Sequence, residues 1–418
     1  MGYRTIIRGA GIAVLLSQLG ACAVQGTDVA AAVTAEQIHA RALVVDAHAD
    51  IELPDQPSRY AGADGRSKVE PGKMRAGGVD AVVMAAAVGP GPRDAKGYAA
   101  AWAKAQGEID AVLALANDPA NRAVIVTTPA ELLAAHEAQQ SALILGFQNA
   151  RILGEDVSRL QRLYDRGVRV FALTHMGHND FADSSRPVFI GATGSYEVEA
   201  EHGGLSALGR EAIARINALG GVIDVSQLSR QATLQVLQMT TAPVIASHSN
   251  VQALSDVRRN LSDTEIDAIG ANGGVIHISA FKGYLFDSND QALDQRIRSA
   301  RRTAGIAEDY DYPFELYWEI SDTAVQSTFI STVSELLGPG SVEDMLNHID
   351  YVAQRIGVEH VGIGNDFNHG SGIEGFNDAS EALNVTRGLL SRGYTAAQIE
   401  AIWGGNFLRV WERAAAID

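Results

Sequence analysis

The sequence predicts an α/β protein in which eight parallel strands alternate with helices and close into a (β/α)8 barrel. Two observations lead to this fold class. Eight apolar, β-branched runs recur along the chain, and each ends in polar residues; they cover residues 42–48, 79–88, 141–148, 168–175, 220–227, 242–249, 273–280 and 359–367. Segments with helical spacing, such as EDVSRLQRLYDRG and LSALGREAIARINALGG, separate most of these runs. Near-continuous apolar strands that alternate with helices are typical of a parallel sheet covered on both faces. Eight such units fit a closed barrel.

An open, doubly wound sheet could use the same eight runs and is the alternative fold. No glycine-rich phosphate-binding fingerprint follows the first run, which disfavours a dinucleotide-binding version of that fold. The long stretch 281–358 between the last two runs is predicted to form a helical excursion beside the barrel. Because the chain contains no internal repeat and no low-complexity linker, residues 35–415 are predicted to form a single catalytic domain.

The composition is that of a globular protein with a large core. The chain has 418 residues, of which 46% are hydrophobic, and a formal net charge of −17. It contains no run rich in lysine and arginine and no stripe in which basic and aromatic residues alternate. These features disfavour nucleic-acid binding, and an acidic surface mainly promotes solubility.

The first 22 residues are predicted to be a targeting segment. Arg4 and Arg8 precede the apolar stretch GIAVLLSQLGA, which is too short to be a permanent membrane-spanning helix. The segment ends in LGAC, which resembles a bacterial lipobox, so Cys22 is expected to carry a lipid anchor on an exported protein. Cys22 is the only cysteine in the chain and therefore has no intrachain disulfide partner. The alternative is cleavage at the A-x-A-like site of residues 21–23, which would give a soluble periplasmic protein.

Polar residues with metal-binding chemistry end the first predicted strand. In the run VVDAHADI, His48 and Asp50 are two positions apart and therefore point to the same side of a strand. An imidazole and a carboxylate that leave one buried strand together suit a divalent metal ion. The alternative is a strand end capped by two solvated polar groups. In a (β/α)8 barrel the catalytic groups leave the C-terminal strand ends, where this sequence also has Gln148, His175, Gln227, His248 and Asp366.

A series of motifs in a fixed order adds a family resemblance. The motifs are VVDAHADI, LGFQNA, LYDRGVRVFALTH, NDFADSS, IDVSQLS, PVIASHSN, RRNLSD, VGIGNDF and SRGYTAAQIEAIWGGNFLRVWE. With these motifs the chain resembles the membrane (renal-type) dipeptidase family of the amidohydrolase superfamily over residues 35–415. The resemblance implies a (β/α)8 barrel with two zinc ions, typically in a homodimer, that hydrolyses dipeptides or other small amides.

The same resemblance implies a set of metal ligands, from which this sequence departs twice. By the family pattern, His48 and Asp50 bind the first ion, and His248 and a histidine of the fifth strand bind the second. A glutamate at the end of the third strand bridges the two ions. Here Gln148 stands at the position of the bridging glutamate, and Gln227 stands at the position of the fifth-strand histidine.

The resemblance also implies three residues that act on the substrate. His175 is expected to polarise or orient the scissile carbonyl group. Arg259 is expected to bind the substrate carboxylate, although it could also be a surface residue at the start of a helix. Asp366 is expected to transfer a proton between the attacking water and the leaving amine.

The two glutamines predict a weakened metal centre. Two divalent cations about 3.5 Å apart repel each other by roughly 19 kcal/mol at an effective dielectric constant of about 20. A bridging carboxylate offsets much of this repulsion and a neutral amide offsets little, so zero or one zinc ion per chain is expected rather than two. The predicted function is a metal-dependent, dipeptidase-like hydrolase with a mononuclear or weakened centre. The alternatives are a non-catalytic, peptide-binding relative and a tailoring enzyme that uses the same barrel.

Other polar residues near these strand ends have open roles. His178 and His369 could act as replacement metal ligands, or they could be loop histidines with backbone partners. His277 lies inside the seventh run and is predicted to be a packed core histidine or to orient a neighbouring group. Asp46 and Asp224 are predicted to orient neighbouring residues rather than to bind metal.

Overall fold

The computed structural model describes residue 2 and residues 33–53, 56, 58–314 and 319–416. The compact unit that carries the fold spans Thr34–Asp418. Cys22 and nearly all of the predicted targeting segment lie outside the described residues. Within the described residues, no helix combines the length and the apolar character needed to cross a lipid bilayer.

Parallel strands of the main sheet form a nearly closed barrel, as the sequence predicts. In hydrogen-bonded order they are β1 (Val45–Asp50), β2 (Ala81–Ala87), β4 (Ser141–Gln148), β5 (Val168–Ala172), β8 (Val222–Asp224), β9 (Ile245–Ala246), β10 (Val275–Ile278) and β11 (Val361–Ile363). Seven of these strands lie within the predicted runs, and β1 extends two residues beyond the first run, to Asp50. The chain following β11 returns to β1, where the Asp50 amide donates to the Phe367 carbonyl at 2.9 Å and the Asp366 amide donates to the His48 carbonyl at 3.0 Å. Because the strand order does not reverse and its ends meet, the open-sheet alternative is wrong.

Side chains of the barrel strands alternate between two apolar layers. Ala81 and Val83 of β2 belong to the interior of the barrel, whereas Val82 and Met84 face the surrounding helices. Helix α14 (Asn406–Ala415) covers the end of the barrel at which the strands begin, with Phe407, Val410 and Trp411 joining the interior cluster. The opposite end, where the strands finish, is therefore the end that can hold a site.

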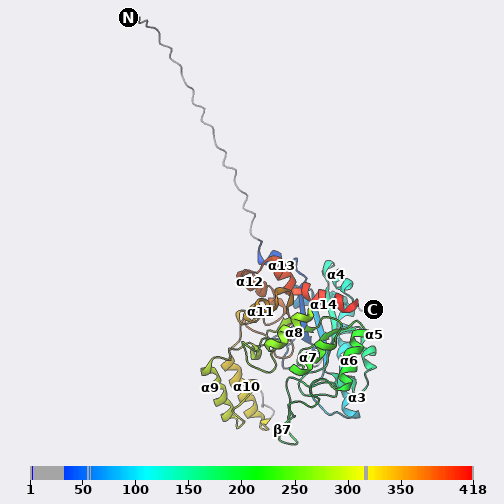
Figure 1. The fold of residues 1–418 in the computed structure, drawn as a ribbon, viewed down its shortest axis with the longest axis vertical. Helices are drawn as coiled ribbons and strands as arrows, with labels where there is room; N and C mark the ends of the chain where they lie inside the picture. The colour runs from blue at the N-terminus through cyan, green and yellow to red at the C-terminus, as the bar shows by residue number, and fades with distance from the viewer. Residues whose placement is uncertain (1, 3–32, 54–55, 57, 315–318, 417–418) are drawn as a thin grey trace. The chain divides into compact units, whose positions relative to one another are not determined.

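Helices surround the barrel, and polar N-caps mark where several of them begin (Figure 1). They are α2 (Pro71–Gly77), α3 (Ala95–Asn117), α5 (Arg159–Asp165), α6 (Ala207–Ala218), α7 (Arg230–Met239), α8 (Asp263–Asn272), α11 (Val342–Ile356) and α12 (Leu383–Ser391). The other helices of this part of the fold are α1 (Ala35–His39), α4 (Pro129–Glu137) and α13 (Ala396–Glu400). The side chains of Ser206, Ser229 and Ser341 accept hydrogen bonds from the first turns of α6, α7 and α11. Such caps satisfy amides that have no partner inside the helix, so they fix where each helix starts.

Three elements of the sheets were not predicted from the sequence. Strand β3 (Ala123–Ile125) pairs with β4 outside the path of the barrel, and β6 (Phe189–Ile190) forms a hairpin with β7 (Ser195–Tyr196). These strands are two or three residues long, which is too short for an alternating hydrophobic pattern to identify them.

The segment 281–358 contains two helices that pack against each other and a third that covers the barrel. Helices α9 (Gln291–Thr303) and α10 (Thr323–Leu337) pack against each other through Phe329, Val333 and Ala300, and Figure 1 shows them side by side. Helix α11 instead packs on α8, β10 and β11 and so covers the barrel itself.

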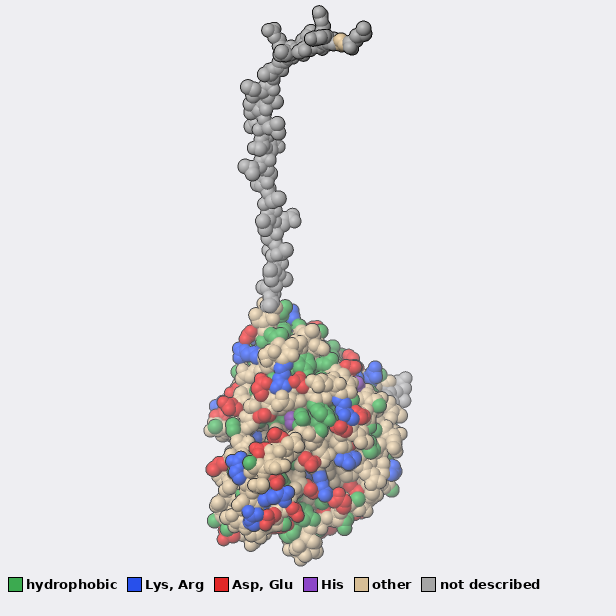
Figure 2. All heavy atoms as spheres, turned by 60° about the vertical axis from the view of Figure 1, so that its left-hand side comes forward, with side chains coloured by type: hydrophobic (Ala, Val, Ile, Leu, Met, Phe, Trp, Pro, Cys, Tyr) green, Lys and Arg blue, Asp and Glu red, His purple; other side chains and the backbone are tan. Residues whose placement is uncertain are grey.

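The surface carries charges of both signs. Figure 2 shows basic and acidic side chains interspersed over the visible face. Arg355, for example, pairs with Asp263 at 2.9 Å and with Asp267 at 2.6 Å. Exposed pairs of this kind contribute little to the free energy of unfolding. The packed interior is therefore the main source of stability.

A buried histidine on α11 makes the stability of the barrel depend on pH. The Nδ1 atom of His348 accepts a hydrogen bond from the Val251 amide at 3.0 Å, and burial lowers the pKa of His348 to about 3. In the unfolded chain this imidazole has a pKa of about 6.5, so below that pH the unfolded state binds a proton that the folded state excludes. The stabilisation is present above pH 6.5 and is lost as the pH falls from 6.5 towards 3.

We predict that His348→Asn, which keeps an acceptor atom but does not titrate, reduces the acid sensitivity of folding. Between pH 7 and pH 5 the wild-type protein should lose about 2 kcal/mol more unfolding free energy than the variant, because about 1.4 kcal/mol is lost per pH unit below pH 6.5. Urea denaturation at the two pH values measures the difference. Equal losses in the two proteins would contradict a neutral His348 in the folded state.

Candidate metal centre

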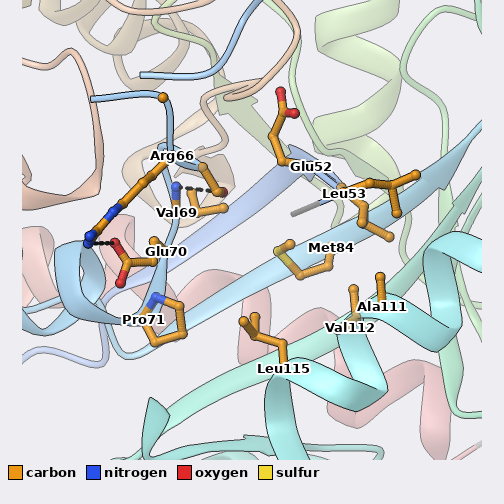
Figure 3. A pocket seen from close by; sticks show the side chains of 13 residues that line it. Glu52, Leu53, Arg66, Val69, Glu70, Pro71, Met84, Ala111, Val112 and Leu115 are labelled. Carbon is orange, nitrogen blue, oxygen red and sulfur yellow. Dashed lines mark hydrogen bonds and ion pairs between the residues drawn. The ribbon is translucent and has the colours of Figure 1, made fainter. Parts of the chain in front are cut away.

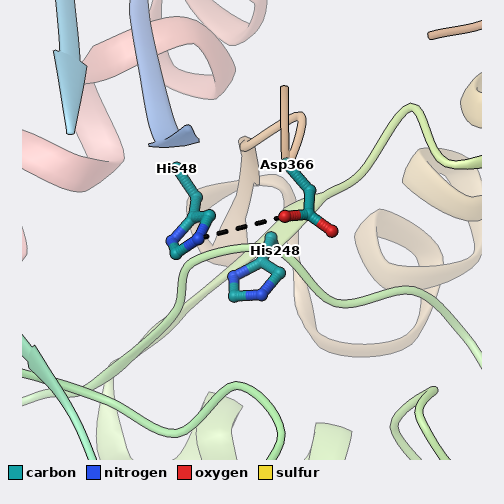
Figure 4. Close-up of side chains that lie close together, drawn as sticks. All are labelled: His48, His248 and Asp366. Carbon is teal, nitrogen blue, oxygen red and sulfur yellow. Dashed lines mark ion pairs between the residues drawn. The ribbon is translucent and has the colours of Figure 1, made fainter. Parts of the chain in front are cut away.

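Three side chains with metal-binding chemistry meet where the barrel strands end (Figure 4). His48 lies in β1, His248 follows β9 by two residues, and Asp366 follows β11 by three residues. All three are buried, and one ligand atom from each lies within 4.8 Å of the others. The two imidazoles are stacked with ring centroids 3.8 Å apart, and His48 Nε2 lies 4.0 Å from Asp366 Oδ1. This cluster is a buried candidate site for a divalent metal ion.

A single serine hydroxyl orients both imidazoles. Ser247 Oγ lies 2.7 Å from His248 Nδ1 and 3.3 Å from His48 Nδ1, and it donates to Asp224 Oδ2 at 2.5 Å. Because the one hydroxyl proton of Ser247 is used in the hydrogen bond to Asp224, the oxygen can only accept hydrogen bonds from the two rings. The Nε2 atom of each ring is then the nitrogen that faces the metal centre.

The two stacked imidazoles titrate differently. Burial lowers the pKa of His48, but the nearby Asp50 carboxylate and the charge of Asp366 outweigh burial and raise this pKa above its ordinary value. Burial holds the pKa of His248 well below its ordinary value, and the neighbouring charge of His48 adds to this effect. His248 is therefore neutral over the physiological range, whereas a metal ion has to displace a proton from His48.

Asp50 extends this cluster towards a second histidine. Its Oδ1 atom lies 3.6 Å from His48 Nε2, and its Oδ2 atom accepts a hydrogen bond from His369 Nδ1 at 2.8 Å. Burial lowers the pKa of His369, but the charge of Asp50 outweighs it and raises this pKa to about 9. His369 is thus a cation paired with Asp50, and in this state it has no lone pair to offer a metal ion.

Gln148 and Gln227 both lie at this end of the barrel. Gln148 is the last residue of β4, and its Nε2 atom lies 3.4 Å from His248 Nε2. Gln227 follows β8 by three residues, and its backbone carbonyl accepts from the Ser185 amide at 2.9 Å. The Oε1 atoms of both glutamines are buried and have no hydrogen-bond partner among the described residues. Gln148 therefore stands beside His248 with an unused acceptor, and Gln227 has an unused acceptor at the same end of the barrel.

His175 and Arg259 approach the same region. His175 follows β5 by three residues, and its ring lies edge-on to His369 with centroids 5.0 Å apart. Burial, together with the charge of His369, holds the pKa of His175 well below its ordinary value. Arg259 donates to the His248 carbonyl at 2.5 Å and to Ser249 Oγ at 3.1 Å. Its Nε atom is buried without a hydrogen-bond partner in the part of the chain that the structure describes.

Backbone strain accompanies two of these positions. Asp366 and Gln227 have φ values of 60° and 64°, in the left-handed region that non-glycine residues seldom adopt. The hydrogen bond from the Asp366 amide to the His48 carbonyl holds one of these turns in place. Burial raises the pKa of the Asp366 carboxyl group, and the charge of Asp50 adds to this rise against the opposing effect of His369. Strained residues are concentrated at functional sites, where the surrounding structure fixes them.

The remaining polar residues have structural partners. His178 contacts the Ser184 amide and the Val198 carbonyl, so it is a loop histidine with backbone partners. His277 is buried and lies 3.0 Å from the Ala246 carbonyl through Nδ1, which agrees with a packed core histidine.

Asp46 and Asp224 have the predicted orienting role. Asp46 accepts hydrogen bonds from the Asn365 side chain at 2.9 Å and from the Asn365 amide at 2.8 Å. Asp224 acts through Ser247. The contact of Ser247 with both imidazoles and the pairing of His369 with Asp50 were not predicted from the sequence. The motif SHSN placed Ser247 directly before His248, but only the fold shows that its hydroxyl reaches His48.

The comparisons with known proteins decide the family. The sequence profile of the membrane dipeptidase family, peptidase family M19, matches residues 33–418. This chain belongs to the membrane dipeptidase family. The predicted resemblance is thus confirmed at the level of the family.

Two curated members of the family are fungal dipeptidases. Dipeptidase aclJ of Aspergillus oryzae is 29% identical over 66% of this chain and 52% of its own length. Dipeptidase tcpJ of Claviceps purpurea is 28% identical over 64% of this chain and 50% of its own length. The chain therefore spans about half the length of these curated relatives.

Solved structures share the fold. The probable dipeptidase PvdM from Pseudomonas aeruginosa has a TM-score of 0.81 and 31% identity, covering 92% of this chain and 98% of that one. A metallopeptidase from Rhodobacter sphaeroides, liganded with a phosphinate mimic of L-Ala-D-Ala, has a TM-score of 0.64 and 20% identity. It covers 89% of this chain and 99% of its own, and at this identity it supports the fold alone.

We predict that Ser247→Ala weakens metal binding by about 10- to 100-fold, because both imidazoles lose the group that orients them. Titration calorimetry with zinc measures the change. The matched control is Ser279→Ala, which removes another buried hydroxyl, one that donates to the Asn365 carbonyl at 3.1 Å. Equal zinc affinities for the two variants would contradict the orienting role of Ser247.

Proposed function

We propose that this chain is a hydrolase that cleaves dipeptides or similarly small amide-linked amino acids with at most one tightly bound zinc ion. The observation that carries the proposal is the buried convergence of His48, His248 and Asp366 in a member of the membrane dipeptidase family. Gln148 and Gln227, which stand where the family resemblance expects a bridging glutamate and a histidine, distinguish this centre from a two-metal one.

The chemistry of the side chains fits one divalent ion. His48 Nε2 and Asp366 Oδ2 are buried and have no hydrogen-bond partner among the described residues, as expected of atoms whose partner is a metal ion. Gln148 and Gln227 contribute no charge, so they do not offset the repulsion between two cations. His48, His248 and Asp366 would hold the ion, with Asp50 beside them.

The residues of this chain supply the other parts of amide hydrolysis. A bound divalent ion supplies Lewis acidity and lowers the pKa of a bound water. His175, which stays neutral, donates a hydrogen bond to the scissile carbonyl oxygen and so orients it. Asp366, a buried carboxylate whose pKa burial raises, takes a proton from the attacking water and passes it to the leaving amine. Arg259 binds the substrate carboxylate through N–H groups that the loop contacts leave unused.

One contact favours a second candidate, a non-catalytic protein that binds small peptides on the same barrel. Gln148 Nε2 lies 3.4 Å from His248 Nε2, so the amide can donate to the lone pair that a metal ion needs. The substrate-side groups His175 and Arg259 remain in place, which a binding protein would also require. Metal content and turnover together separate the two candidates.

We predict that the purified protein retains at most one zinc ion per chain after dialysis, since the charge that would bridge two ions is missing at Gln148. Elemental analysis against protein concentration gives the ratio. A parallel sample of His248→Ala, which loses one of the three converging ligands, should retain well below half of the wild-type zinc. Two firmly held ions per wild-type chain would contradict the electrostatic argument.

We predict that Gln148→Glu combined with Gln227→His restores a two-metal centre. The double variant should bind two zinc ions and hydrolyse dipeptides faster than the unmodified protein, because His175 and Arg259, which act on the substrate, are already in place. Each single change should achieve less, since the ligands of one centre act as a unit.

Steady-state kinetics over a panel of L,L and L,D dipeptides, with zinc analysis, tests this repair. If the double variant folds and binds two ions but cleaves no dipeptide, the hydrolase proposal fails. The binding-protein candidate would then replace it.

A further inference from the structure

A cavity with five aromatic residues in its wall lies beside the candidate metal centre, and Arg59, Arg186 and Lys282 also line it. Its volume is about 370 Å³. The aromatic residues that line it are Tyr60, Phe281, Tyr284, Tyr312 and Phe314. A volume of this size is at the lower end of small-ligand pockets, so it suits one large side chain rather than a long peptide.

Two residues join this aromatic pocket to the groups that act on the substrate. His369 lines the pocket and also donates to Asp50 at 2.8 Å. Tyr284 lines the pocket, and the Arg259 guanidinium lies 5.2 Å from the centre of its ring. The pocket is therefore in contact both with the metal-binding cluster and with the arginine expected to bind the substrate carboxylate.

The rings of the pocket support one another. Phe281 and Tyr284 are stacked with centroids 4.3 Å apart, and Tyr284 lies 5.6 Å from Tyr312. Tyr312 in turn lies 5.7 Å from Phe314, and the Arg186 guanidinium lies 4.5 Å from the centre of the Tyr312 ring. Because each ring is held by its neighbours, the pocket is preformed, and an incoming group meets ring faces and edges that are already ordered.

Two other cavities do not share these connections. One, of about 300 Å³, lies between β2 and α3 and is lined by apolar residues such as Met84, Val112 and Leu115 (Figure 3). The other lies between α9 and α10, with Phe329 in its wall. Among the described residues that line these two cavities, none belongs to the candidate metal centre. The aromatic pocket, unlike these two cavities, is placed to select a substrate.

We propose that the aromatic pocket binds an aromatic side chain of the substrate, so that the preferred substrates are dipeptide-like molecules with a phenylalanine- or tyrosine-like residue. This inference rests on the proposed function and specifies its substrate class. Aromatic rings gain from edge-to-face and offset stacking beyond the gain from burial alone, by about threefold to tenfold in affinity for each good ring pair. A pocket with several rings therefore favours an aromatic group over an alanine side chain.

The test measures binding separately from turnover. Zinc-loaded protein is titrated calorimetrically with non-hydrolysable phosphinate analogues of Ala-Ala, Phe-Ala and Ala-Phe. At least one aromatic analogue should bind about 30-fold or more tightly than the Ala-Ala analogue, and the position of its ring shows which residue of the substrate enters the pocket. Equal affinities for all three analogues would overturn the proposal.

Variants that fill the pocket provide the matched comparison. Ile330 and Ser334 on α10 are half-buried and line the pocket, so Ile330→Trp and Ser334→Phe should fill it. Either variant should weaken binding of the aromatic analogue at least tenfold and leave the Ala-Ala analogue within about twofold. Phe286→Ala is the control, because Phe286 packs on the same aromatic cluster but does not line the pocket. An aromatic preference that survives both filling variants would overturn the proposal.

The outcomes also separate this inference from the proposed function. Tight, pocket-dependent binding of aromatic analogues without hydrolysis of the matching dipeptides would support the pocket and overturn the hydrolase proposal. Hydrolysis of dipeptides with no difference between aromatic and alanine analogues would support the hydrolase and overturn the pocket.

Discussion

The candidate site depends on one hydrogen-bonded hydroxyl group, that of Ser247. Asp224, at the end of β8, accepts a hydrogen bond from the Ser247 hydroxyl. It also accepts hydrogen bonds from the backbone amides of Ser226 and Ser247, at 2.8 Å and 2.9 Å. The hydroxyl oxygen then faces the Nδ1 atoms of His48 and His248, which come from strands on different parts of the barrel. One buried carboxylate thus fixes the turn after its own strand, the turn after the next strand and the orientation of both imidazoles.

The charges around this hydroxyl support the proposal of a single ion. Asp50 and Asp366 contribute two negative charges to a buried region, and protonated His369, which is hydrogen-bonded to Asp50, contributes one positive charge. The three groups together carry one negative charge, so one divalent cation leaves only one positive charge in excess. A second would leave a large positive excess, because Gln148 and Gln227 are neutral. The side-chain oxygens of both glutamines are buried without partners among the described residues, so a ligand at this end of the barrel can bond to them.

The metal centre and the aromatic pocket are two parts of one site, connected by His369 and Tyr284. The barrel strands supply the metal-binding residues, and segments inserted after the strand ends supply most of the aromatic rings. This division is common in (β/α)8 barrels, in which rigid strands place the reacting groups and variable loops determine what binds. Family membership therefore indicates the chemistry more firmly than the substrate.

The sequence by itself determined the barrel and the end of it that carries the site. Strand patterns are local, and residues at or just after the ends of parallel strands, such as His48, His248 and Asp366, have to lie at the same mouth of the barrel. Only the tertiary structure decided which of these side chains touch. Three features depend on loop conformations that no periodic pattern encodes. They are the pairing of His369 with Asp50, the hydroxyl shared by His48 and His248, and the ring contacts of Tyr284 with Phe281 and Tyr312. The short strands β3, β6 and β7 escaped prediction because tertiary pairing, rather than their own few residues, holds them in place.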